Sequence, residues 1–469
     1  MKKLLTLISF VMAAHFCKAN NVTTANVSLG SQNTALHYSM VKFDIAWENS
    51  WRTVTNESNY DGCWVFVKFR KKNTYAWQHA TFNYVSPGTA AASGHTEPSG
   101  STIKTAADGK GIFIYRNAVG NGNVNYTGAQ LRWNYNADGV ADNDSVEIKL
   151  FAVEMVYVPQ GSFYLGSNGT ESYHFRRGDK DTCFEVTSEN VITVGASASN
   201  LYSASPGTLQ NGTIPALYPK GFNGFWCMKY EISQQQYADF LNTLDAATAT
   251  ARTPFGFSSG THPNLLPNQP ERALNGMSND DVLSLLDWSA LRPMTELEYE
   301  KACRGANQAP VPNEYAWGNT TIEFIQNPTD FGLSTETWAS GNIAYNQSAP
   351  MRCGALATST SSRQSSGGSF YGIMEMSGNV YEMVVSADIP GRTFISKNGD
   401  GYLGGASQNF DVAEWFNGSP GFYGYRGDYY AQSPAYYSYA AISNRVSYFT
   451  YYNNSRLAGG GGRGVRTAE

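Results

Sequence analysis

Charged side chains are scarce in this chain of 469 residues. They make up 15% of the sequence, against roughly 25% in a typical soluble domain. Lysine and arginine number 33 and aspartate and glutamate 38, which leaves a net charge of −5. Since no block of basic residues marks a surface for nucleic acid, nucleic acid is excluded as the main partner. Glycine (46) and tyrosine (30) are abundant instead, and this composition predicts a turn-rich protein with much irregular structure.

Long apolar runs are also rare, and the one that stands out lies at the N-terminus. Met1-Lys-Lys is followed by an apolar run over residues 4–14 and then by Cys17-Lys18-Ala19, the pattern of a secretory signal peptide. We expect residues 1–19 to be removed by cleavage after Ala19; lipid attachment at Cys17 is an alternative. The run is shorter than the roughly 20 residues of a membrane span. The sequence therefore predicts an exported protein without a transmembrane span, in the periplasm, at the cell surface or secreted.

Cysteine is the third scarce feature, with six in the chain. No CxxC pair occurs, so zinc is not indicated. Export permits disulfides, and Cys303 with Cys353 is the candidate pair. No cysteine follows Cys353, an absence that matters for the chemistry considered below.

Residues 20–150 carry a hydrophobic period of two. Val41, Phe43, Ile45 and Trp47 alternate with polar or small residues, and several later segments repeat this pattern between turn-rich loops. Short strands without a helical window are typical of a β-sandwich. We therefore predict an all-β, sandwich-like N-terminal domain over residues 20–150.

Three aspartates near the end of this region allow two interpretations. Asp138, Asp142 and Asp144 stand close together in a stretch rich in Asn and Gly. Their oxygens suit calcium, but the same residues are also typical of a hairpin turn. We favour the turn.

After residue 151 the pattern changes to short helices and irregular segments. Ser233 with Gln236, and Thr295 with Glu298, have the spacing of capping boxes at helix N-termini. Each precedes an apolar stripe, and the second helix should stop at a glycine. A third short helix is expected over residues 281–289.

Six motifs occur in order across this second region. They are Met155-Val-Tyr-Val-Pro-Gln-Gly-Ser-Phe-Tyr-Leu-Gly166, Phe225-Trp-Cys-Met-Lys-Tyr-Glu-Ile-Ser233, Leu291-Arg-Pro-Met-Thr-Glu-Leu-Glu-Tyr-Glu-Lys-Ala302, Tyr315-Ala-Trp-Gly-Asn319, Tyr371-Gly-Ile-Met-Glu-Met-Ser-Gly-Asn-Val-Tyr-Glu382 and Gly462-Arg-Gly-Val-Arg466. Together they resemble the formylglycine-generating enzyme (FGE-sulfatase, or sulfatase-modifying factor) family. The resemblance implies an α+β, C-type-lectin-like fold over residues 151–469, preceded here by the all-β domain.

The family's chemistry depends on two cysteines near the C-terminus. Its enzymes hold copper(I) with that pair and oxidise a cysteine of a sulfatase peptide to formylglycine. Copper(I) requires soft thiolate ligands, but the corresponding stretch here reads Tyr448-Phe-Thr-Tyr-Tyr-Asn-Asn-Ser455. The resemblance therefore implies a divergent member without the copper pair, and we expect neither copper binding nor formylglycine-generating activity.

The resemblance also implies a structural calcium site. The matching positions are the side chains of Glu375 and Glu382 and the main-chain carbonyls of Gly378 and Val380, hard oxygen ligands of the kind Ca²⁺ takes. The alternative is that both glutamates cap backbone amides in a metal-free core. A second family calcium site would use Asn342 and the carbonyl of residue 343, but its aspartate has no counterpart here.

Tyrosine is concentrated at the C-terminus. Residues 420–469 hold ten of them: Tyr423, Tyr425, Tyr429, Tyr430, Tyr436, Tyr437, Tyr439, Tyr448, Tyr451 and Tyr452. Tyr with Ser, Gly and Asn is the chemistry of adaptable binding surfaces, and in the family this segment lines the substrate groove. The predicted ligand-binding residues are Asn444, Arg445, Tyr448, Tyr451, Tyr452 and Arg456. The alternative is that the aromatic rings simply fill a loop-rich core.

Two functions follow from these observations. The first is an exported, non-catalytic relative (a pseudoenzyme) that binds a protein, peptide or glycan through a Tyr-rich C-terminal face, as a binding or structural component of the cell envelope or extracellular space. The second is an enzyme with altered chemistry, similar to the pyoverdine-maturation relatives, that matures an exported protein or peptide. We favour the first.

Overall fold

The computed structural model describes residues 22–469 except 73, 75, 204–208, 255, 359, 416–418 and 447–454. The predicted signal peptide lies outside the described residues. The first part of the described chain consists mainly of strands: β1 (Thr23–Asn33), β2 (Tyr38–Arg52), β3 (Asp61–Lys71), β4 (Gln78–His79), β5 (Ser101–Thr105), β6 (Ile112–Arg116), β7 (Gly120–Trp133) and β8 (Val146–Val158). The short helices α1 (Ala90–Ser93) and η1 (Tyr135–Asp138) interrupt them.

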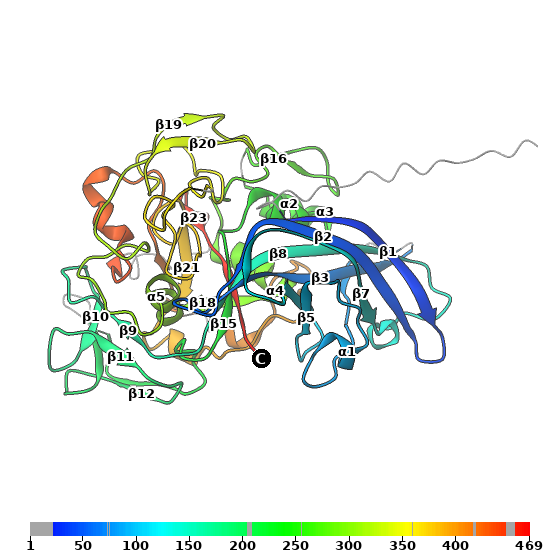
Figure 1. Ribbon diagram of the computed structural model, residues 1–469, viewed down its shortest axis with the longest axis horizontal. Helices are drawn as coiled ribbons and strands as arrows, with labels where there is room; N and C mark the ends of the chain where they lie inside the picture. The colour runs from blue at the N-terminus through cyan, green and yellow to red at the C-terminus, as the bar shows by residue number, and fades with distance from the viewer. Residues whose placement is uncertain are drawn as a thin grey trace, which may run out of the picture.

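The alternating pattern of β2 buries one face of the strand. Val41, Phe43, Ile45 and Trp47 are at most 1% exposed and pack in one core cluster with residues of β3, β6 and β7. The strands β1, β2 and β7 form a three-stranded sheet whose long β1–β2 hairpin extends away from the rest of the molecule (Figure 1). Because successive side chains of a strand point to opposite faces, a strand with alternating apolar residues buries its apolar face against a second layer of strands.

A single large sheet continues from this region into the rest of the chain. Its order is β22-β21-β18-β24-β15-β8-β3-β6-β5, with β23 pairing β21 and β4 pairing β3. The additional strands are β15 (Phe225–Met228), β18 (Arg292–Thr295), β21 (Tyr381–Val385), β22 (Tyr423–Arg426), β23 (Gly460–Gly461) and β24 (Gly464–Thr467). In Figure 1 the C-terminal strand β24 (red) runs through the middle of the molecule beside β15 and β18.

Strand β8 joins the two parts, and the boundary expected between residues 150 and 151 falls inside it. The first half of β8 pairs only with β3, where Leu150 lies opposite Val67. The second half pairs with both β3 and β15, and Met155 lies opposite Met228 of β15. Buried side chains add to this connection, because the indole N–H of Trp64 donates to the carbonyl of Ser289 at 2.8 Å.

The helices begin where capping boxes predict them. In α2 (Gln234–Leu241) and α5 (Glu296–Arg304) both reciprocal bonds of the predicted boxes are present, and α5 ends at Gly305 with a φ of 97°. The third predicted helix is α4 (Asn279–Trp288), which begins two residues earlier than expected because Ser278 and Asp281 form another capping box. Sequence reasoning missed α3 (Ala246–Arg252), whose N-cap is Asp245.

The remaining elements are short. They are β9 (Phe163–Leu165), β10 (Phe175–Arg177), β11 (Phe184–Val186), β12 (Ile192–Val194), β13 (Leu201–Ser203), β14 (Gly212–Ile214), β16 (Ser258–Ser259), β17 (Leu266–Pro267), β19 (Gln326–Thr329), β20 (Thr337–Ser340), η2 (Gly391–Thr393), η3 (Ala413–Trp415) and η4 (Pro434–Ala440). The whole is a mixed α/β structure with many strands and few helices, which is consistent with the α+β class that the resemblance implies. Among the described residues, no helix has the length and apolar character needed to cross a membrane.

Candidate functional site

The predicted calcium ligands lie on and beside one tight turn. Glu375, Gly378 and Asn379 all have positive φ (57°, 92° and 68°), and the turn leads directly into β21, which carries Glu382. The side chain of Glu231 holds this turn, because its carboxylate accepts from the Asn379 amide at 2.5 Å and from the N–H of Val380 at 2.9 Å. Sequence reasoning missed Glu231, although it stands within the second of the six motifs.

An arginine lies against the same carboxylates. Arg463 donates from Nε to Oε1 of Glu382 at 2.8 Å, and its other nitrogens donate to the carbonyls of Met228 at 3.0 Å and Met374 at 2.7 Å. Both Arg463 and Glu382 are buried. Arg463 contacts only Oε1 of Glu382, so Oε2 is not used by this ion pair.

Two carboxylate oxygens at this turn have no hydrogen-bond partner. They are Oε2 of Glu375 and Oε2 of Glu382, and both are buried; Oε1 of Glu375 accepts from the N–H of Gly354 at 2.9 Å. Burial raises the pKa of Glu375 to about 7 and also raises the pKa values of Glu382 and Glu231. Unsatisfied buried oxygens are rare, and carboxylate oxygen is the donor that Ca²⁺ prefers. The residues present therefore fit a calcium ion.

The second family calcium position is already occupied by protein hydrogen bonds. Oδ1 of Asn342 accepts from the N–H of Glu323 at 2.9 Å, and its amide donates to the carbonyl of Thr321 at 3.2 Å. The carbonyl of Ile343 accepts from Ile325 at 3.0 Å. We therefore assign no cation to these groups.

The aspartates of the 136–144 stretch belong to a turn. Asp138 accepts from the indole of Trp133 at 2.6 Å, and Asp144 accepts from the N–H of Ala141 at 2.9 Å. Asp142 is bonded to His37 at 2.8 Å. Each carboxylate has its own protein partners, which favours the turn over a calcium site. The stretch is not a hairpin, however, because β7 and β8 belong to different sheets.

A different acidic group was not foreseen. Asp287, Asp400 and Asp411 bring carboxylate oxygens within 4.8 Å of one another. The carboxylate of Asp287 accepts from the backbone N–H groups of Asp400 at 3.1 Å and Asp411 at 3.0 Å. Burial raises the pKa of Asp287 to about 7. These contacts give Asp287 the role of holding two loop backbones.

The described tyrosines of the C-terminal segment differ in burial. Tyr423, Tyr425 and Tyr430 are buried, the first two on β22. Tyr436 and Tyr437 of η4 are 48% and 44% exposed. Tyr429 and Tyr439 are half-buried. The alternative of core filling therefore holds for the buried tyrosines, and Tyr436 and Tyr437 are the most exposed of the described ones.

The predicted polar anchors are held by other protein groups. Asn444 and Arg445 are buried, and Arg445 donates to both oxygens of Glu296 at 2.8 and 2.9 Å. Arg456 is 36% exposed and pairs with Asp281 at 3.0 Å. Arg445 and Arg456 thus fix the chain on either side of residues 447–454. Tyr448, Tyr451 and Tyr452 lie outside the described residues, and ligand binding by this set stays a prediction.

Four of the five described cysteines are buried, and Cys183 is half-buried. All five described cysteines are free, so the suggested Cys303–Cys353 bridge is wrong; the two side chains pack in different core clusters. Burial raises the pKa of Cys183 to about 11 and that of Cys227 to about 12, and it also raises those of Cys63, Cys303 and Cys353. A raised pKa disfavours the thiolate, which is the form that binds metal and attacks substrates.

Comparison with known protein families gives a match. The model of a family described as the sulfatase-modifying factor enzyme 1-like domain (FGE-sulfatase) matches residues 147–450, well over half of the chain. The comparison with curated proteins finds no match. The matched range begins at β8 and contains the turn of Glu375 and Glu382 as well as η4. The family resemblance is thereby confirmed, and five of the six motifs lie within the matched range; the motif at residues 462–466 lies outside it.

Proposed function

The chain belongs to the sulfatase-modifying factor enzyme 1-like family over residues 147–450, and on this premise we propose that it is an exported, non-catalytic member. It binds a protein, peptide or glycan in the cell envelope or the extracellular space. The observation that carries the proposal is the loss of the copper ligands. No cysteine follows Cys353, and burial raises the pKa of every described thiol.

Exposed tyrosines on a fixed support favour binding. Tyr436 and Tyr437 project from η4, and the rings of Tyr436 and Tyr439 lie 5.4 Å apart. The chain just after η4 is held by the buried Arg445–Glu296 pair. Aromatic rings that are already held in place lose little conformational entropy when they bind, and Tyr and Arg are frequent at binding hot spots.

The proposed calcium ion has a structural role. The side chains of Glu375 and Glu382, with the carbonyls of Gly378 and Val380, would ligate it at the turn before β21. Bound there, Ca²⁺ would add positive charge beside two buried carboxylates of which Glu382 is already paired with Arg463. The turn is followed by β21, the strand that pairs with β22.

An oxidation assay tests the non-catalytic assignment. The purified protein is incubated with copper(I), oxygen and a peptide containing CxPxR, and the peptide is analysed by mass spectrometry, with an active family enzyme as the positive control. We expect the peptide cysteine to remain unchanged while the control converts it. Conversion by this protein would overturn the proposal.

A further inference from the structure

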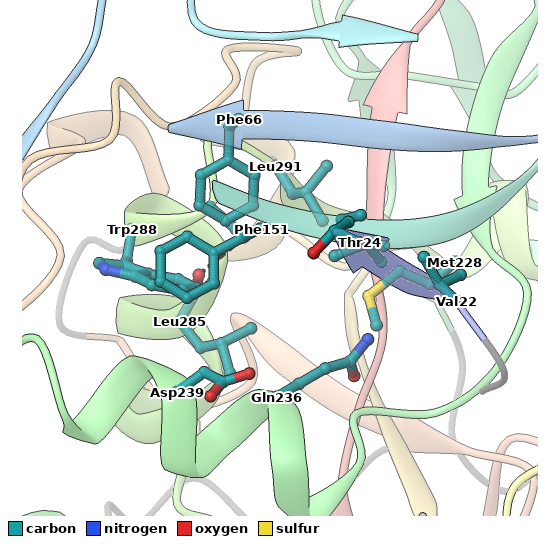
Figure 2. A pocket seen from close by; sticks show the side chains of 13 residues that line it. Val22, Thr24, Phe66, Phe151, Met228, Gln236, Asp239, Leu285, Trp288 and Leu291 are labelled. Carbon is teal, nitrogen blue, oxygen red and sulfur yellow. Dashed lines mark hydrogen bonds between the residues drawn. The ribbon is translucent and has the colours of Figure 1, made fainter. Parts of the chain in front are cut away.

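Two hollows of the molecule differ in size and lining. The first is the apolar pocket of Figure 2, which is lined by Phe66, Phe151 and Trp288 on one side and by Met228 and Val22 on the other. Its volume is about 30 Å³, which is room for a few water molecules at roughly 10–15 Å³ each, so this pocket is a packing gap in the core. The second is a groove of about 250 Å³ where the chain passes from β11 to β12. The groove is large enough for one sugar ring.

Side chains that both donate and accept hydrogen bonds line the groove. They are the hydroxyl groups of Thr187, Thr193 and Ser199 and the amides of Asn190 and Asn200. All of these residues are exposed except Asn200, which is half-buried. Within the part of the chain that the structure describes, none of these side chains makes a hydrogen bond to another protein group. Their donors and acceptors are therefore available to a ligand.

The walls of the groove are held in place by the surrounding structure. β12 pairs with both β13 and β14, and β11 pairs with β9. The carboxylate of Glu189 fixes the loop between β11 and β12, because it accepts from the N–H of Lys220 at 2.7 Å and from the N–H of Asn223 at 3.0 Å. Ser199 has a φ of 65°, a strained conformation of the kind that gathers at ligand sites. A groove formed before its ligand arrives lowers the entropic cost of binding.

Apolar surface and one carboxylate complete the lining. Val191 is 56% exposed and Phe184 is half-buried. Glu185 is the one charged residue among the residues that line the groove, and its exposed carboxylate forms no ion pair with any described residue. This carboxylate repels a second negative charge.

This lining is complementary to a sugar. A sugar ring carries hydroxyl groups around its edge and C–H groups on its faces, which match the hydroxyl and amide side chains and the surface of Val191. We propose that the groove binds a pyranose ring that carries no acidic group. The site is separate from the exposed tyrosines of η4, none of which lines the groove.

Simple glycosides test the proposal on the purified chain. The methyl glycosides of glucose, galactose and mannose are screened by saturation-transfer NMR, and any that binds is compared with its uronic acid by calorimetry. We expect at least one neutral glycoside to bind with a Kd of about 1 mM, and its uronic acid to bind about threefold more weakly because of Glu185. Binding of none of the three, or equal binding of the acid, would overturn the proposal.

Matched variants locate the site. Thr187→Val/Thr193→Val keeps the size of two exposed side chains and removes their hydroxyl groups, so it should weaken the bound glycoside about tenfold. Thr337→Val, which changes an exposed threonine of β20, is the control and should bind as the wild type does. Unchanged binding by the double threonine variant, with melting like that of the wild type, would contradict the assignment.

Two further variants separate the charge and the location. Glu185→Gln should bind the uronic acid as tightly as the neutral glycoside, since the repelling charge is gone. Tyr436→Ala/Tyr437→Ala should leave glycoside binding unchanged, so a failure of this proposal is distinguishable from a failure of the proposed function. Loss of glycoside binding in the tyrosine variant would place the sugar at η4 and overturn the groove assignment.

Discussion

Arg445 and Glu296 form a two-point ion pair in the core, with Nε and Nη2 of the arginine 2.8 and 2.9 Å from the two carboxylate oxygens. Burial alone would raise the pKa of Glu296, but Arg445 and Arg426 together lower it. Arg445 also lies over the ring of Phe175, 4.2 Å from its centroid. The pair ties the chain after η4 to the first residue of α5, so the support of the exposed tyrosines is part of the core.

Breaking this pair from one side should destabilise the protein strongly. Arg445→Met leaves the carboxylate of Glu296 with one cation fewer, and we expect a loss of about 3–5 kcal/mol in the free energy of unfolding, measured by urea denaturation. The double variant Arg445→Met/Glu296→Met should recover part of that loss, because it removes the carboxylate that the single variant leaves short of a cation, while Arg426 keeps Glu300 as a partner. A single-variant loss below about 1 kcal/mol would show that the pair does not hold the segment.

Calcium should stabilise the folded protein. At a hundredfold excess over Kd, an ion that binds only the folded state adds about 2.7 kcal/mol, seen as a rise in melting temperature over the same protein in EDTA. Glu375→Gln keeps the size of the side chain but removes its charge, and this variant should lose the calcium increment. The control is Glu185→Gln, which changes an exposed carboxylate on β11 and should keep the increment. Identical melting in EDTA and in millimolar calcium would remove the ion from the account.

The calcium effect should depend on pH in a defined direction. The pKa of Glu375 is raised from 4.5 to about 7 by burial, so the folded state holds this proton more tightly than the unfolded state. Without calcium, the contribution of Glu375 to the free energy of unfolding is fully present below pH 4.5 and is lost as the pH rises to about 7. Because the ion binds the deprotonated carboxylate, the calcium increment should be small at pH 6 and larger at pH 8.

Glu375→Gln isolates this titration. The pKa of Asp287 is also raised to about 7, so the pH profile of the wild type alone mixes several groups. In EDTA, the free energy of unfolding of the wild type minus that of Glu375→Gln should decline between pH 4.5 and 7 and stay constant above pH 7. A difference that does not change over this range would contradict the raised pKa.

Local sequence signals predicted three of the described α-helices, α2, α4 and α5, but missed α1 and α3. Ser233 with Gln236 and Thr295 with Glu298 located α2 and α5, because a capping box is formed within one turn of chain. The pairing of β8 with both β3 and β15 could not be derived in this way, since partners far apart in sequence are chosen by tertiary packing.

The site was predicted in part. The motif around Glu375 and Glu382 predicted the turn. Glu231 and Arg463 come from distant segments of the sequence, and their contacts with this turn are seen only in the structure. Tyrosine composition could not separate the buried Tyr425 from the exposed Tyr437, because one end of the side chain is apolar and the other polar.

The most direct test of the account concerns the exposed tyrosines of η4. Arrays of envelope glycans and of peptides are probed with the wild type, with the double variant Tyr436→Ala/Tyr437→Ala, and with Tyr202→Ala as a control on β13. We predict that at least one array component binds the wild type and the control, that the double variant binds it about tenfold or more weakly, and that all three melt alike. Unchanged binding by the double variant, or no array component bound by the wild type, would contradict the proposal that this protein works through its C-terminal tyrosines.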